Sequence, residues 1–190
     1  MSDRRLLALD LVVKGALVAL LLFGVFSGLE RFEGKAFGGR ALTYPIAALI
    51  VPIAWFFWAR RSRYPYALDI LIVLPFLIDT AGNALDLYDS LGWWDDANHL
   101  VNWLLLVLGF GQILFRSRLE RPVTFGLALG FGAVTHILWE IGEYFAFIRD
   151  NPDEYRTAYT DTVGDLGLSL AGSALGAILL VTVFWPRRVT

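Results

Sequence analysis

Long apolar segments alternate with short polar ones along the chain, and this pattern predicts a series of membrane-spanning helices. A helix needs about 20 apolar residues to cross the hydrocarbon core of a bilayer. Residues 1–190 are therefore expected to form a single integral membrane domain, all-α and polytopic, built as a six-transmembrane-helix bundle. The expected spans lie at about 7–29, 42–59, 65–88, 97–115, 122–148 and 162–185.

The basic residues between these spans orient the chain across the bilayer. Most of them fall on one set of span ends, and short loops rich in Lys and Arg stay in the cytoplasm. Because the number of expected spans is even, both termini are expected on the cytoplasmic side. The cytoplasmic group is Arg4, Arg5, Arg60, Arg61, Arg63, Arg116, Arg118, Arg121, Arg187 and Arg188, whereas Arg31, Lys35, Arg40, Arg149 and Arg156 fall outside.

Composition supports the membrane class and excludes several kinds of site. Hydrophobic residues make up 57% of the chain, more than is usual for a soluble domain. The chain has no cysteine, so neither a disulfide framework nor a thiolate metal site is possible. The basic residues form short clusters that topology explains, so no nucleic-acid partner is expected. The partner that the sequence does predict is the lipid bilayer.

The fifth expected span carries a histidine and two carboxylates on one face. His136, Glu140 and Glu143 are spaced i, i+4, i+7, which places them on a single stripe of a helix. An ionised side chain near the middle of the bilayer costs about 2.5–3.5 kcal/mol on the insertion scale. Such residues face the bundle interior or a water-filled cavity, and they mark functional sites.

Three other expected spans carry polar stripes at the same, outer level, which predicts one polar cup open to the outside. The inner halves are apolar apart from Asp69, which we expect to be hydrated, and from Asp10 and Lys14, which we expect to pair across one helical turn. The stripes are Asp79, Asn83 and Asp86 in the third span, Asp96, His99 and Asn102 in the fourth, and Asp161 and Asp165 in the sixth.

The cup has the chemistry of a divalent metal site. No Lys or Arg lies within these helix stretches, so either some carboxyl groups hold protons or cations are bound. Two imidazoles with several carboxylates and no thiolate suit zinc, iron or manganese. Asp96-x-x-His99 has the acid-x-x-His spacing of di-iron carboxylate bundles, although only one such pair is present. The expected ligands are Asp96, His99, His136, Glu140, Glu143 and Asp165, with Asp79, Asn83, Asp86, Asn102 and Asp161 supporting them.

Four strings between residues 79 and 172 resemble a known family. They are DTAGNALDLYD (79–89), WWDDANH (93–99), HILWEIGEY (136–144) and YTDTVGDLGLSLAG (159–172). They look like the signature of the YjdF-type bacterial inner-membrane family, a domain of unknown function, over roughly residues 65–185. The resemblance implies a bacterial inner-membrane protein but supplies no reaction.

A looser similarity runs to VanZ-like membrane proteins, which have an acid and a histidine at one helix start, a later helix with Glu, and an Asp before a Gly-rich last span. In this comparison Asp95-x-x-x-His99 takes the first of those places. Glu140 or Glu143 takes the second, and Asp161 or Asp165 takes the third.

Three classes of function fit these observations. The first is a metal-dependent enzyme acting near the outer leaflet on a lipid or lipid-linked headgroup, with Glu140 as the general base. The second is a proton- or cation-coupled transporter that uses the same carboxylates as a relay, although no polar path continues inward. The third is a non-catalytic scaffold in which the polar groups only hold the bundle together.

Overall fold

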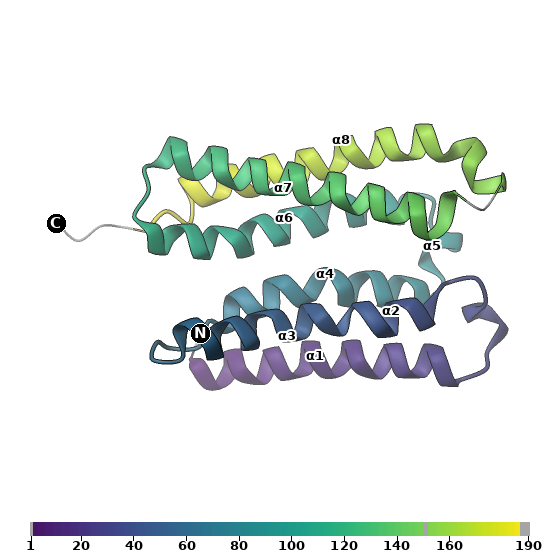
Figure 1. The fold of residues 1–190 in the computed structure, drawn as a ribbon, viewed down its shortest axis with the longest axis horizontal. Helices are drawn as coiled ribbons and strands as arrows, with labels where there is room; N and C mark the ends of the chain where they lie inside the picture. Colours follow the sequence, from purple (N-terminus) through teal and green to yellow (C-terminus); the bar gives the residue numbers. More distant parts are fainter. Residues whose placement is uncertain (1, 150–151, 187–190) are drawn as a thin grey trace. The chain divides into compact units, whose positions relative to one another are not determined.

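The computed structural model describes residues 2–149 and 152–186, and it is helical throughout, without a strand among those residues. The chain divides into two compact units, Met1–Asp95 and Asp96–Thr190. Each unit contains three long antiparallel helical segments (Figure 1). The basic residues Arg187 and Arg188, which contributed to the predicted topology, lie outside the described residues.

The first unit is built around the packing of its first and last long helices, α1 and α4. Between them, the chain turns through short helices, and Pro45 opens one of these because proline fits the first position of a helix. The elements are α1 (Asp3–Phe26), the 3-10 helix η1 (Glu30–Phe32), α2 (Phe37–Thr43), α3 (Pro45–Ala54), the π-helical turn η2 (Trp55–Ala59), α4 (Tyr66–Ala84) and α5 (Leu87–Ser90).

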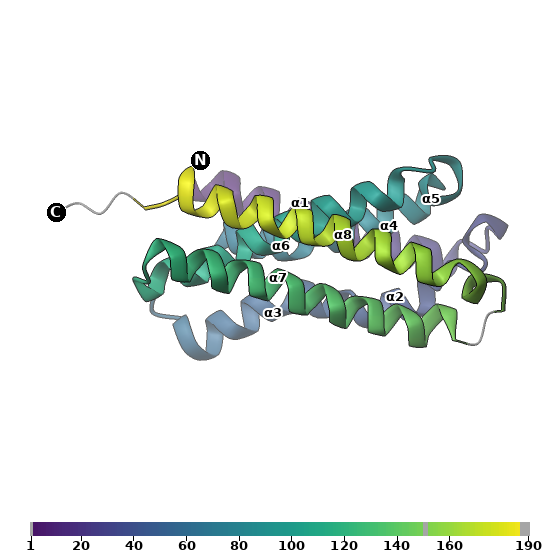
Figure 2. The ribbon, with the colours of Figure 1, turned by 90° about the horizontal axis from the view of Figure 1, so that it is seen from above.

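The second unit consists of three long helices that lie side by side in both views (Figures 1 and 2). Its apolar core is formed by Val107, Leu114, Ala128, Ala177 and Leu180. The elements are α6 (Trp94–Leu114), the 3-10 helix η3 (Phe115–Ser117), α7 (Arg121–Glu143), the π-helical turn η4 (Tyr144–Ile148) and α8 (Pro152–Thr182).

Glycine brings α6 and α8 into backbone contact. A Cβ atom added at Gly172 would lie 2.0 Å from the carbonyl oxygen of Leu100, so only glycine fits this position without moving a helix. One turn further along α8, a Cβ atom at Gly176 would lie 3.2 Å from the carbonyl oxygen of Leu104. The small-xxx-small spacing thus allows the close approach that membrane helices use to pack.

Among the described residues, six helical segments are long and apolar enough to cross a membrane, which confirms the predicted number of spans. The main difference in boundaries is at the last of them, because α8 already begins at Pro152, well before residue 162, the expected start of the last span. The six segments are Asp3–Phe26, Phe37–Ala59, Tyr66–Ala84, Trp94–Ser117, Arg121–Ala146 and Tyr155–Thr182.

The distribution of polar and apolar side chains is that of a protein surrounded by lipid. Large apolar side chains such as Leu42 and Trp58 are more than four-fifths exposed. Charged or hydroxyl side chains such as Asp69 and Ser169 are fully buried. In water this arrangement would be costly, whereas in a bilayer the apolar surface meets acyl chains and the polar groups pair inside the bundle.

Candidate metal site

The centre of the candidate site in the second unit is His99, a buried imidazole on α6. Its Nδ1 atom lies 3.1 Å from the hydroxyl of Ser169 and 3.9 Å from Oε1 of Glu140. Its Nε2 atom lies 3.5 Å from Oδ1 of Asp165. Carboxylates from two different helices, α7 and α8, therefore approach opposite edges of one ring.

Two overlapping groups of side chains around His99 have the geometry for a metal ion. In the first, the ligand atoms of His99, Glu140 and Glu143 all lie within 4.8 Å of one another. In the second, His99 is joined within the same limit by Asp165 and by Asp95, which stands in the first turn of α6. Four of the six predicted ligands thus belong to these two groups, in which only His99 is shared: His99, Glu140, Glu143 and Asp165.

A single tryptophan connects His99 to the second predicted imidazole ligand. The indole of Trp103 stacks on His99 and meets His136 edge-on, with 5.7 Å between ring centroids in both pairs. The indole N–H of Trp103 donates to the hydroxyl of Thr135, 3.3 Å away, on the helix that carries His136. Sequence patterns gave no role to Trp103, because an aromatic residue in a span is usually packing material.

His136 is buried with both ring nitrogens lacking a hydrogen-bond partner among the described residues. An imidazole has one donor and one acceptor to satisfy, and leaving them unpaired in an apolar interior is costly. Glu140 follows one helical turn later on the same face of α7 and is also buried. The two ring nitrogens of His136 are therefore available to bind one further polar species.

The structure separates the two adjacent aspartates at the start of α6. Asp96 was the predicted ligand, but its side chain is exposed, and it is Asp95 that lies with His99 and Asp165. Asp161 is exposed too, one turn before the buried Asp165. Asn102 is buried and donates to Asn98, 3.3 Å away. One residue along a helix is a rotation of about 100°, which explains why neighbouring acids face different ways.

Asp79, predicted to support the metal ligands, has a complete set of partners within the first unit. Its carboxylate accepts hydrogen bonds from Arg40 Nε at 3.0 Å, Tyr44 at 2.6 Å, Tyr88 at 2.8 Å and Asn83 at 3.1 Å. Burial and the neighbouring Asp79 raise the pKa of Tyr88, so its hydroxyl remains a donor at neutral pH. The expectation of an acidic stripe without a basic partner is wrong at this position.

Asp86 lies near the end of the same stripe, and it also has a cation beside it. Lys35 forms ion pairs with Asp86 and, at 2.7 Å, with Asp89. The hydrogen bond from Lys35 lowers the pKa of the Asp86 carboxyl. Burial opposes the charge on Lys35, but its hydrogen bonds to the two aspartates outweigh this effect and raise the pKa of the amine.

A second buried charge cluster lies between α1 and α4. Lys14 pairs with Asp10 at 3.4 Å, as predicted, and it also contacts Asp69. Asp69 is fully buried and accepts a further hydrogen bond from Tyr64, so its expected hydration is wrong. One ammonium therefore serves two carboxylates, and the Oδ1 atoms of both aspartates have no hydrogen-bond partner among the described residues.

A buried cluster of carboxylates and imidazoles inside a helical membrane unit places this chain among polytopic membrane proteins with an intramembrane polar site. A family model described as "Predicted membrane protein (DUF2238)" matches residues 11–186, and the chain belongs to that family. This agrees with the resemblance to an uncharacterised YjdF-type membrane family. No curated protein and no solved structure matches the chain.

Proposed function

We propose that this chain is a bacterial inner-membrane protein whose second unit binds a divalent metal ion, zinc, iron or manganese. The proposed ligands are His99, His136, Glu140, Glu143 and Asp165. The observation that carries the proposal is the meeting of carboxylates from α7 and α8 at the single imidazole of His99. A divalent cation bound at one edge of this ring would pair with the carboxylates on that side and would offset the repulsion between the acids.

The donor set suits catalysis on a lipid or lipid-linked headgroup. A bound divalent ion would supply a Lewis acid that activates water near neutral pH. Glu140 is buried beside His99, which positions its carboxylate to accept a proton as general base. Acidic residues on α8 run from the exposed Asp161 to the buried Asp165, so a polar headgroup could reach the cluster from that end.

We further propose that the chain is one membrane domain with both termini in the cytoplasm. The family model spans both units, which supports a single domain. The concentration of arginine at one set of span ends supports the orientation. In this topology the cluster around His99 lies toward the outer leaflet.

Elemental analysis of detergent-purified protein, without a chelating tag, tests the proposal. We expect close to one equivalent of metal in the wild type, and its loss in His136→Ala and Glu140→Ala, with membrane insertion retained. Glu33→Ala removes an exposed carboxylate that is distant in sequence from the proposed ligands, and it serves as the control. Undiminished metal in both site variants would exclude this ligand set, and a metal-free wild type would favour the scaffold alternative.

A matched pair of variants separates the two aspartates at the start of α6. Asp95→Ala removes a carboxylate that lies with His99 and Asp165, and we expect it to reduce the bound metal. Asp96→Ala removes an exposed neighbour, and we expect it to leave the metal content unchanged. The opposite outcome would support Asp96 as the metal ligand, as the acid-x-x-His spacing predicts.

Cation or proton transport is a second candidate, favoured by the buried cluster of Lys14, Asp10 and Asp69. These ionisable groups come from α1 and from the first turn of α4, and they are the exceptions to the otherwise apolar inner halves of the expected spans. Purified protein in proteoliposomes with a pH-sensitive dye would reveal proton flux. Flux that disappears in Asp69→Asn would support transport, and its absence in the wild type would leave the metal site as the better account.

A further inference from the structure

The second unit contains a pocket at the place where α6 ends, α7 begins and α8 ends. Its volume is about 390 Å³, within the range of small-molecule sites. Thr182, the last residue of α8, is roughly 25 Å along the helix from Asp165, at 1.5 Å per residue, so the pocket is separate from the candidate metal site. The lining residues are Leu114, Phe115, Arg118, Leu119, Thr124, Trp185 and Pro186.

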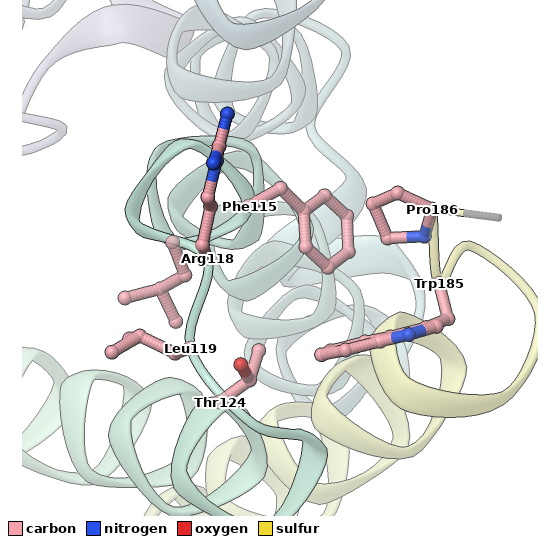
Figure 3. A pocket seen from close by; sticks show the side chains of 7 residues that line it. Phe115, Arg118, Leu119, Thr124, Trp185 and Pro186 are labelled. Carbon is pink, nitrogen blue, oxygen red and sulfur yellow. The ribbon is translucent and has the colours of Figure 1, made fainter. Parts of the chain in front are cut away.

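One side of this pocket is apolar and aromatic. The rings of Phe115 and Trp185 meet edge-on, with centroids 5.9 Å apart, and Leu119 lies across from them (Figure 3). The hydroxyl-bearing side chain of Thr124 lies at the base and is almost fully buried. This side of the pocket can therefore receive an apolar chain.

The rim of the same pocket is basic. Arg118 lines this rim. Its backbone is in the left-handed conformation, with φ 52°, and the chain turns there from α6 toward α7. The guanidinium of Arg121 lies 5.3 Å from the ring centre of Trp185, close enough for a cation–π contact. Arg116 is a third exposed base in this turn, and Glu120 is the acid among them.

The pocket lies at the ends of the candidate membrane spans. One candidate span ends at Ser117 and the next begins at Arg121, so the pocket lies where the hydrocarbon core gives way to the headgroup region. Trp185 beside it is the kind of residue that marks this boundary. Basic pockets between membrane helices at this level hold the headgroups of anionic lipids.

We propose that this pocket binds one anionic phospholipid from the surrounding leaflet. Arg118 and Arg121 contact the headgroup phosphate, and the upper part of an acyl chain lies against Leu114, Phe115 and Leu119. A phospholipid has a negatively charged headgroup next to apolar chains. The pocket has a basic rim next to an apolar wall, so its chemistry complements that of the lipid. The inference does not depend on metal binding in the second unit.

Native mass spectrometry and thermal unfolding of the full chain in mild detergent test the proposal. Phosphatidylglycerol, phosphatidylcholine and inorganic phosphate are added in parallel. We expect phosphatidylglycerol to remain bound and to raise the unfolding midpoint more than the other two. Arg118→Gln and Arg121→Gln should each weaken its binding about fivefold, because each base near an anionic headgroup contributes about that factor.

Two further variants make the outcome specific. Leu119→Trp fills the pocket without changing charge, and it should displace phosphatidylglycerol while the protein stays folded. Arg60→Gln together with Arg61→Gln removes two exposed bases from the first unit, and it should leave binding unchanged. Equal stabilisation by phosphatidylcholine, an equal effect of inorganic phosphate, or equal loss in the Arg60 and Arg61 double variant would overturn the proposal.

Discussion

The imidazole of His99 lies parallel to the indole of Trp103, with an angle of 3° between the two planes. The same indole meets His136 at 78°, so one side chain contacts both imidazoles of the chain. Trp103 is itself fixed by its hydrogen bond to Thr135. Groups that orient metal-binding imidazoles contribute strongly to affinity without touching the ion.

Replacing Trp103 by leucine is therefore expected to weaken metal binding about 10- to 100-fold, the usual cost of losing an orienting neighbour. The physical reason is that both rings gain freedom to turn away from the acids. Competition with a chelator of known affinity measures the change. Trp93→Leu, at an exposed tryptophan, is the matched control. Equal metal affinity in the two variants would show that Trp103 only fills space.

Removing the ammonium of Lys14 should destabilise the first unit. In Lys14→Met, two buried aspartates lose their shared cation, and breaking a buried ion pair in this way costs about 3–5 kcal/mol. Unfolding of the purified protein by a denaturing detergent reports the loss. Adding Asp69→Asn to the same chain removes one of the unpaired charges and should recover part of it. A double variant no more stable than the single one would contradict this account.

Gly172→Ala is expected to destabilise the second unit by about 1–3 kcal/mol, the usual cost of forcing extra atoms into a packed interface. The new methyl group would meet the carbonyl oxygen of Leu100, so α6 and α8 would have to separate. Thermal unfolding in detergent measures the effect. Gly167→Ala on the same helix, with open space at its Cβ position, should be neutral or slightly stabilising. Similar midpoints for both variants would exclude tight packing at Gly172.

The ion pair between Lys35 and Asp86 makes the stability of the first unit sensitive to acid. Because Lys35 lowers the pKa of Asp86 in the folded chain, the pair stabilises above the unfolded value of about 3.9 and is lost as pH falls through the lower, folded value. The raised pKa of Lys35 has the opposite sense, so its contribution is complete below about pH 10.4 and is lost as pH rises through the higher folded value.

The measurement is the unfolding midpoint as a function of pH for the wild type and for Asp86→Asn. Asparagine is chosen because this residue has φ 62°, a left-handed conformation that asparagine tolerates. We expect the wild type to be the more stable at pH 7 and the difference to shrink below about pH 4. A constant difference across this window would exclude the pairing as its cause.

Apolar segment length was enough to predict the six helices, because the thickness of the bilayer sets the length of a span. Spacing along one helix also predicted the pair of Asp10 and Lys14 and the shared face of His136 and Glu140. These features depend only on local geometry, which the sequence carries directly.

Contacts between helices could not be predicted in the same way. Arg40 reaches Asp79 from 39 residues earlier, and Lys14 reaches Asp69 across 55 residues. Asp95 and Asp96 are adjacent and chemically identical. Which of them lies beside His99 depends on how α6 is rotated about its axis, and the sequence does not define that rotation. The position of Ser169, one turn after Asp165, indicated that it shares a face with that acid. A hydroxyl on a membrane helix can also bond to its own backbone, so this spacing alone did not predict its contact with His99.

The contact of α8 with the main chain of α6 at Gly172 also limits how anything can travel to His99. Two helices whose backbones touch leave no passage between them at that point, so nothing reaches the buried Ser169 between Gly172 and Leu100. An ion or headgroup would enter and leave by the same route, past Asp161. If the second unit binds an ion, its exchange would then depend on access from the Asp161 end of α8.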